Sequence, residues 1–175
     1  TALLNSYFPE AFVSIGHDAL EAGWQSAAHR MVVDFGLSDE FFLPLACDGQ
    51  REPYLSLIPA LASAANRELV ALQVSFQRCR NAWAPAVREV VGESESDCLF
   101  SDAPHFVRLA KQKTATPLFA VTLRLGLAAS DGTSLRNLGR AVMPFIKGFE
   151  RPGSNELMPL DNDDYPDEAH ERSFL

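Results

Sequence analysis

An α+β domain built on an antiparallel sheet is the fold class that this 175-residue sequence predicts, and three observations predict it. First, segments 68–78 and 117–128 alternate apolar and polar residues with the period of two that is typical of half-buried strands. Second, segments 53–65 and 134–148 carry apolar residues at helical spacing, as amphipathic helices do. Third, the expected elements follow one another in the order β, α, β, then an insertion, then β, α, β.

The first 45 residues carry weaker signals. A strand is expected around 11–15, and Asp18 suits the N-cap of a short helix over 19–28. Residues 31–37 and 41–45 are both strand-like and are separated by a short polar turn. This pair predicts either a hairpin or one long strand with a bulge.

The two strongest strands are each expected to have one apolar and one polar face. On the apolar faces lie Leu72, Val74, Phe76, Phe119, Val121, Leu123 and Leu125, and on the polar faces lie Gln73, Ser75, Gln77, Thr122 and Arg124. We therefore expect a sheet with one buried face and one face that is solvated or turned toward a partner.

Residues 80–116 are expected to form a helical insertion. Segments 83–91 and 104–113 are each typical of a helix, and the polar residues 92–102 between them predict a mobile loop. We expect the two helices to lie over one face of the sheet.

The C-terminal part of the domain predicts one more helix and one short strand. Thr133 or Ser134 is expected to cap the helix over 134–148, and residues 155–160 are strand-like. Taken together, the elements from residue 30 onward predict a ferredoxin-like split β-α-β sandwich, in which an antiparallel sheet carries helices on one face and a helical insertion.

The expected organisation is an N-terminal arm over 1–29, the α+β domain over 30–160 and an acidic tail over 161–175. The acidic residues of the tail are Asp161, Asp163, Asp164, Asp167, Glu168 and Glu171. Because the sequence begins at Thr1 rather than Met and stops abruptly, we expect a piece of a longer protein, whose tail leads to a downstream domain.

Composition and charge exclude several function classes. The net charge of −8 argues against a protein whose main task is binding nucleic acid, because phosphate binding needs clustered Lys and Arg. No stretch approaches the roughly 18 apolar residues of a membrane-spanning helix, and the N-terminus lacks the features of a signal peptide. Cys47, Cys79 and Cys98 are too far apart for a zinc ribbon, so we expect reduced thiols in a cytoplasmic protein.

No catalytic, cofactor-binding or metal-binding residue is predicted. The sequence lacks both the G-x-x-x-x-G-K-[ST] loop that holds phosphates and the G-x-G-x-x-G fingerprint. His105 with Asp102 is the nearest approach to a metal site, but the spacing matches no ligand motif. Either Cys79 or Cys98 can pair with His105 in space, although a small buried thiol is the reading that the sequence favours.

Basic residues flank the two strong strands and are the candidate contacts for a partner or for nucleic acid. They are Arg78, Arg80, Arg108, Lys111, Lys113 and Arg124, with Trp83 as the neighbouring aromatic. Basic side chains beside an aromatic ring can hold a phosphate backbone. The polar face of the sheet, however, lacks the exposed aromatics on which an RNA-recognition motif stacks bases.

Three stretches of this sequence resemble a known family. They are the residues 113–125 (KTATPLFAVTLRL), the residues Phe145, Phe149, Glu150 and 153–157 (GSNEL), and the residues Asp48, Glu52, Pro53 and 57–61 (LIPAL) before 69–73 (LVALQ). Together they resemble the region in front of the motor domain in FtsK/HerA-superfamily ATPases of the type IV secretion and conjugation kind. The resemblance covers roughly residues 48–160 and consists of hydrophobic patterns.

The resemblance implies that this piece is the N-terminal accessory module of an ATP-binding translocase that moves DNA or protein. The nucleotide-binding motifs of such a motor are not among these residues, so no catalytic residue or cofactor is carried over. We expect a non-catalytic domain that docks a protein partner or a neighbouring subunit, without membrane insertion. Direct binding of nucleic acid is the alternative.

Overall fold

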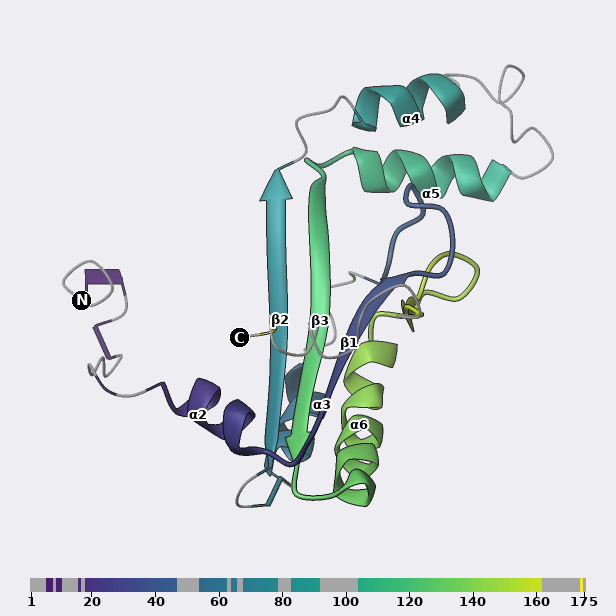
Figure 1. Ribbon diagram of the computed structural model, residues 1–175. Coiled ribbons are helices and arrows are strands. Elements are labelled where there is room, and N and C mark those ends of the chain that lie inside the picture. Colours follow the sequence, from purple (N-terminus) through teal and green to yellow (C-terminus); the bar gives the residue numbers. More distant parts are fainter. Residues whose placement is uncertain are drawn as a thin grey trace.

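The structure, a computed structural model, describes residues 6–7, 9–10, 16, 18–46, 54–62, 64–65, 68–78, 83–91, 104–161 and 174. In chain order its elements are α2 (Ala19–Ser26), β1 (His29–Leu37), α3 (Tyr54–Ala62), β2 (Leu69–Arg78), α4 (Trp83–Val91), α5 (Pro104–Thr114), β3 (Phe119–Ala129), α6 (Gly132–Lys147) and β4 (Leu157–Pro159). The four strands form one antiparallel sheet in the order β2-β3-β1-β4, with α3 and α6 on one face (Figure 1). This is the ferredoxin-like split β-α-β plan, so the predicted fold class is confirmed.

The two halves of the sheet differ in how far their strands pair. β2 and β3 pair along all ten residues of β2, from Leu69 opposite Ala128 to Arg78 opposite Phe119. β1 pairs with β3 only from His29 to Phe35, opposite the later part of β3. Residues 119–122 of β3 and residues 75–78 of β2 therefore extend beyond β1 as a two-stranded ribbon (Figure 1).

The main core lies between the sheet and the helices α3 and α6. Its buried residues are Phe35, Leu57, Ala60, Leu125, Leu127, Ala129, Leu138, Val142, Phe145 and Ile146. In α6 the buried residues Leu138, Val142, Phe145 and Ile146 follow the spacing i, i+4, i+7 and i+8, so one stripe of the helix faces the sheet as predicted. The helix layer ends at the level of Leu72 and Leu123, which are only partly buried.

The insertion forms a second, small core. Val87 and Val91 of α4 pack against Val107 and Ala110 of α5, and Phe42 covers the contact. Both helices are confirmed, but they lie beyond the ends of β2 and β3 rather than over a face of the sheet (Figure 1). The loop expected over 92–102 lies outside the described residues.

Residues 41–45 are not a strand, and this prediction is wrong. Asn155, which is almost fully buried, holds them in a turn instead. Its side-chain amide donates to the carbonyl oxygens of Glu40 (3.0 Å) and Leu43 (3.2 Å), and its oxygen accepts from the N–H of Asp39 (3.1 Å). Because the turn satisfies these backbone groups, Leu43 and Pro44 are buried without strand pairing, while Phe41 stays exposed.

The alternation of the two strong strands is only half realised as burial. The predicted apolar faces are buried at Leu125 and partly buried at Leu72 and Leu123. Phe76, Phe119 and Val121 in the ribbon, and Val74 where the ribbon begins, are exposed. The prediction is therefore wrong for the ribbon. The period of two places these side chains on the helix side, and α3 and α6 do not reach far enough to cover them.

Several other expectations differ in detail or cannot be compared. The helix expected over 53–65 spans Tyr54–Ala62, and that expected over 19–28 spans Ala19–Ser26 with Asp18 as its N-cap, as predicted. The strand expected around 11–15 and the three cysteines lie outside the described residues, as does the tail except Asp161 and Phe174.

The N-cap of α6 is Asp131, whereas Thr133 or Ser134 was the expected cap. Its carboxylate accepts from the backbone N–H of Thr133 (2.8 Å) and of Ser134 (2.9 Å). An aspartate one residue before the first turn reaches both N–H groups, which a serine inside the helix cannot do. The backbone N–H of Ser134, its hydroxyl group and the N–H of Thr133 hold the pKa of Asp131 below its ordinary value.

We predict that Asp131→Ala lowers the melting temperature at pH 7 and that this loss shrinks below roughly pH 4. A lowered pKa means that the folded state favours the carboxylate, so its stabilising effect is present above the unfolded pKa and disappears as the pH falls through the folded one. Thermal unfolding between pH 2 and 7 measures the difference. Asp131→Asn is the control, because it keeps a capping oxygen without titrating; an equal loss for Asp131→Ala at every pH would contradict the account.

Candidate interaction surfaces

The residues predicted to contact a partner or nucleic acid are distributed over three regions of the fold. Arg78 is the exposed last residue of β2, and Trp83 opens α4 with its ring 5.7 Å from that of Phe41. Arg80 lies outside the described residues. Trp83 thus belongs in part to the contact between α4 and the turn at 41–45.

The basic residues of α5 are only partly available. Arg108 and Lys111 are exposed, whereas Lys113 is half-buried and its ammonium donates to the carbonyl oxygens of Phe41 and Leu43 (2.9 Å to the latter). Lys113 therefore fastens the insertion to the same turn that Asn155 holds. Its first role in this fold is structural.

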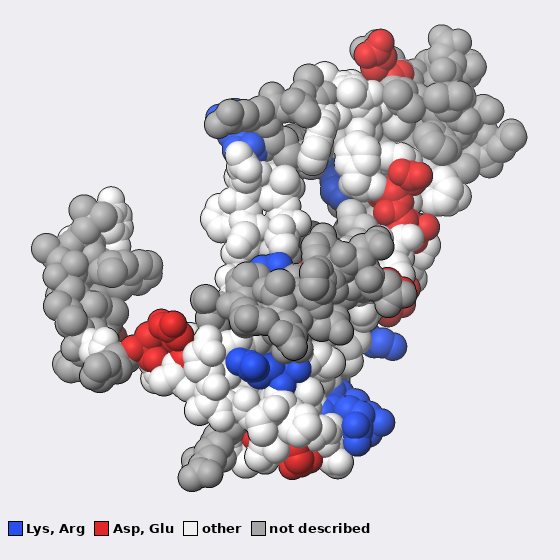
Figure 2. All heavy atoms as spheres, in the orientation of Figure 1, with Lys and Arg blue, Asp and Glu red and all other residues white. Residues whose placement is uncertain are grey.

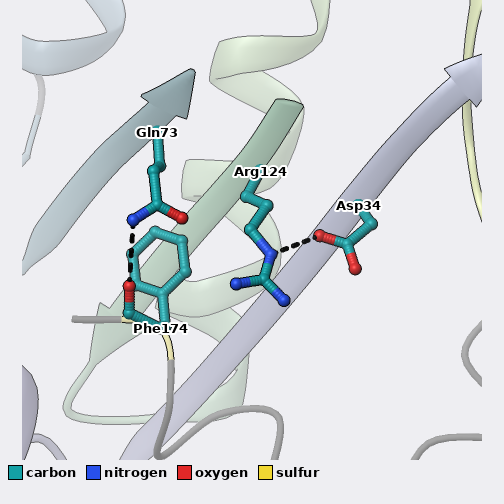
Figure 3. Close-up of polar contacts among 4 residues, drawn as sticks. All are labelled: Asp34, Gln73, Arg124 and Phe174. Carbon is teal, nitrogen blue, oxygen red and sulfur yellow. Dashed lines mark hydrogen bonds and ion pairs between the residues drawn. The ribbon is translucent and has the colours of Figure 1, made fainter. Parts of the chain in front are cut away.

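Arg124 lies at the centre of the face of the sheet opposite α3 and α6, here called the open face. Its Nε donates to Oδ1 of Asp34 on β1 at 2.9 Å, and the two side chains retain 24% and 15% of their exposure (Figure 3). The register places these residues directly opposite each other. A half-buried ion pair of this kind neutralises the guanidinium that the nucleic-acid hypothesis needs.

The predicted basic residues do not form one patch. Figure 2 shows Lys and Arg side chains scattered over the visible face rather than gathered along one element. Arg124 lies within the sheet, while the three residues of α5 lie past its end. The arrangement lacks the continuous basic stripe that tracks a phosphate backbone.

A small apolar cluster that the sequence did not predict covers one end of the open face. Phe174 is buried there against Val32, Ala128 and Trp24, with the two aromatic rings 5.0 Å apart. The amide of Gln73 donates to the carbonyl oxygen of Phe174 at 3.3 Å (Figure 3). This part of the face is therefore neither solvated nor polar.

Gly126 makes room for the Phe174 ring. A Cβ built on Gly126 would overlap the ring, so at this position the absence of a side chain is required. In the sequence, Gly126 interrupts a strand, which is the usual sign that another group approaches the backbone closely. That signal was present, but it does not say which residue approaches.

The ribbon presents an apolar surface on the helix side. The side chains of Phe76, Val121, Val74 and Phe119 are 72%, 57%, 51% and 51% exposed. The rings of Phe76 and Phe119 meet edge to face with centroids 6.1 Å apart, so the surface is ordered around an aromatic pair. We call these four residues the ribbon patch.

The outward side of α3 is also apolar. Its exposed large residues are Tyr54, Leu55, Ile58 and Leu61. The nine residues of α3 include no charged side chain on any face, which is unusual for a helix at the surface. α3 packs on the face of the sheet that carries Leu72 and Leu125, and the period of two places the ribbon patch on the same face.

One hollow among the described residues lies beside the start of α5. It has a volume of about 310 Å³ and is lined in part by Asp39, His105, Glu150, Arg151 and Glu156. Within the described ranges no group of three or more His, Cys, Asp or Glu side chains could hold a metal ion. None of the described helices is both long and apolar enough to cross a bilayer.

Comparison of the chain with protein-family models, with curated proteins and with solved structures found no significant match. The resemblance to FtsK/HerA-superfamily ATPases therefore stays a prediction.

We predict that Gly126→Ala and Phe174→Ala each lower the free energy of unfolding, by about 2 kcal/mol or more for Phe174→Ala, because a buried ring is lost. In the double variant, the loss of unfolding free energy is expected to be much smaller than the sum of the two single losses. The reason is that the methyl group added at position 126 then has no ring to displace. Urea unfolding of all four proteins measures this. Fully additive losses would show that Phe174 does not occupy the space beside Gly126.

Proposed function

We propose that this domain is a non-catalytic protein-docking module, and that its partner is a neighbouring subunit or component of a larger ATP-driven translocase of DNA or protein. The observation that carries the proposal is the ribbon patch. The translocase context comes from the resemblance of residues 48–160 alone.

The ribbon patch has the properties of a docking surface rather than of scattered surface residues. Its four apolar side chains together expose on the order of a few hundred Å², which is the size at which the largest patch of a monomer is often functional. Strand pairing holds all four on one face, and Phe76 and Phe119 are the type of residue that anchors interfaces. A surface of this kind is stabilised when a partner covers it.

The docking proposal predicts that Phe76→Glu weakens association with the partner or neighbouring subunit on the order of tenfold or more, because it places a charge within the patch. Thr122→Glu is the matched control: it adds the same charge to the exposed open face of the same ribbon. Each substitution is introduced into the full-length cellular protein, and the size of its assembly and its transfer of substrate are measured. If both variants assemble and transfer like the parent protein, the proposal is wrong.

Direct binding of single-stranded nucleic acid is the second candidate function, and one observation favours it. Arg78 stands opposite Phe119 at the end of the ribbon, beside the exposed ring of Phe76. A cation next to exposed rings can stack bases and hold a phosphate. The net charge of −8 and the intramolecular contacts of Arg124 and Lys113 give this function less support.

If docking is the function, a single-stranded oligonucleotide is expected to show no salt-dependent binding to the domain even at roughly 50 mM salt. Fluorescence anisotropy over a salt series measures this. Binding that salt removes, and that Arg78→Ala weakens more than Arg140→Ala on α6 does, would favour the second function instead.

A further inference from the structure

The outer edge of β2 lacks the sequence features that normally protect an edge strand, and α2 packs near its start. β2 is an end strand of the sheet, and among the described residues no strand pairs with its free side. The nine residues from Leu69 to Gln77 contain no Lys, Glu, Pro or Gly, and their register with β3 runs without interruption. Charged residues, prolines and bulges are the features by which proteins normally prevent an edge strand from pairing with another chain.

The charges near β2 stand at its two ends and have opposite signs. Glu68 immediately precedes the strand, and Arg78 is its last residue. Two copies of β2 can pair antiparallel about a two-fold axis that passes between their Gln73 residues. In that register, residue 78 of each copy stands opposite residue 68 of the other. Both ends then carry an Arg–Glu pair, so the charge pattern is complementary to itself in this register.

The faces of the strand agree with the same register. Phe76 then stands opposite Val70 of the second copy, and Val74 stands opposite Leu72 of the second copy, all on the helix side. On the open face, Ser75 and Gln77 of the second copy come beside the start of β2, where α2 packs through Gly23 and Leu69. On the helix side, apolar residues thus pair with apolar residues, which is the arrangement that stabilises antiparallel neighbours. On the open face, Ser75 and Gln77 stand opposite Ala71 and Leu69.

The helix layer fits this rotation as well. α3 lies behind the first half of β2 and leaves the second half uncovered (Figure 1). A half-turn about Gln73 sets the covered half of one copy beside the uncovered half of the other. α3 of each copy, which carries no charge on any face, then flanks the ribbon patch of the other.

We infer that the neighbouring subunit is a second copy of this chain, joined by antiparallel pairing of the two β2 edges about Gln73 into one continuous eight-stranded sheet. The inference rests on the proposed docking function and specifies its partner. The interface is isologous, so each contact occurs twice and the assembly closes as a dimer.

A charge exchange tests the inference. Arg78→Glu gives a chain with two negative ends, and Glu68→Arg gives a chain with two positive ends. Each variant alone repels a copy of itself at both ends and is expected to dimerise about tenfold more weakly than the wild-type chain. An equimolar mixture of the two restores opposite charges at both ends and is expected to form heterodimers at close to the wild-type affinity.

Sedimentation velocity over a concentration series measures all three samples, with circular dichroism to check folding. Glu68 also accepts a hydrogen bond from the N–H of Ala65 at 2.7 Å, so Glu68→Arg removes a local contact, and the mixture rather than that variant decides. Arg140→Glu makes the same change in net charge away from the edge and is expected to dimerise as the wild type does.

Two results would overturn the inference: a wild-type chain that stays monomeric throughout, or a mixture that associates no better than its components. The docking function stands without it if Phe76→Glu still impairs assembly of the cellular protein while the isolated chain is monomeric. An unimpaired assembly of the Phe76→Glu protein would instead contradict the docking function itself.

Discussion

The uninterrupted pairing of β2 with β3 is the constraint on which the rest of the structure depends. It is longer than the pairing of β1 with β3, and longer than the layer that α3 and α6 can cover. The excess length has three consequences: a ribbon exposed on both faces, an end strand with a free edge, and an insertion that starts and ends past the sheet. The ribbon patch exists because strand pairing fixes apolar side chains on the helix side where no helix reaches.

The two faces of the sheet are used differently. On the open face, Phe174 fills the space that Gly126 leaves, and Asp34 neutralises Arg124, so little of that face offers either apolar area or free charge. On the helix side, the region past Leu72 and Leu123 offers apolar area, with Arg78 as the charged residue at its end. This difference is why the helix side, rather than the polar face that the sequence emphasised, carries the proposed function.

Local signals in the sequence were sufficient for the fold. Alternation in 68–78 and 117–128 and the apolar stripe of 134–148 predicted elements that the structure contains. In the two strands, however, burial changes along the strand rather than with the period of two. The same alternation predicted burial for Phe76 and Phe119, and there it was wrong. The period of two determines on which face of the sheet a side chain lies. Whether that side chain is buried depends on how far the helices on that face extend.

Contacts between distant segments could not be predicted in the same way. Nothing near 41–45 shows that Asn155 will supply its hydrogen bonds, and nothing near Gly126 identifies Phe174 as the group that fills its space. The candidate basic residues lie within two strands or close to them in sequence. The fold then separated them, because Arg124 lies within the sheet and α5 lies beyond it.

The central claim is that the free edge of β2 is an interface. Every second backbone amide of an end strand points away from its neighbour and is protected from hydrogen exchange only when another strand pairs with it. Hydrogen exchange of the isolated chain, followed by mass spectrometry at increasing protein concentration, reports this directly. The account predicts that protection over residues 70–78 rises with concentration while that of α6 stays constant; protection in β2 that is independent of concentration would contradict it.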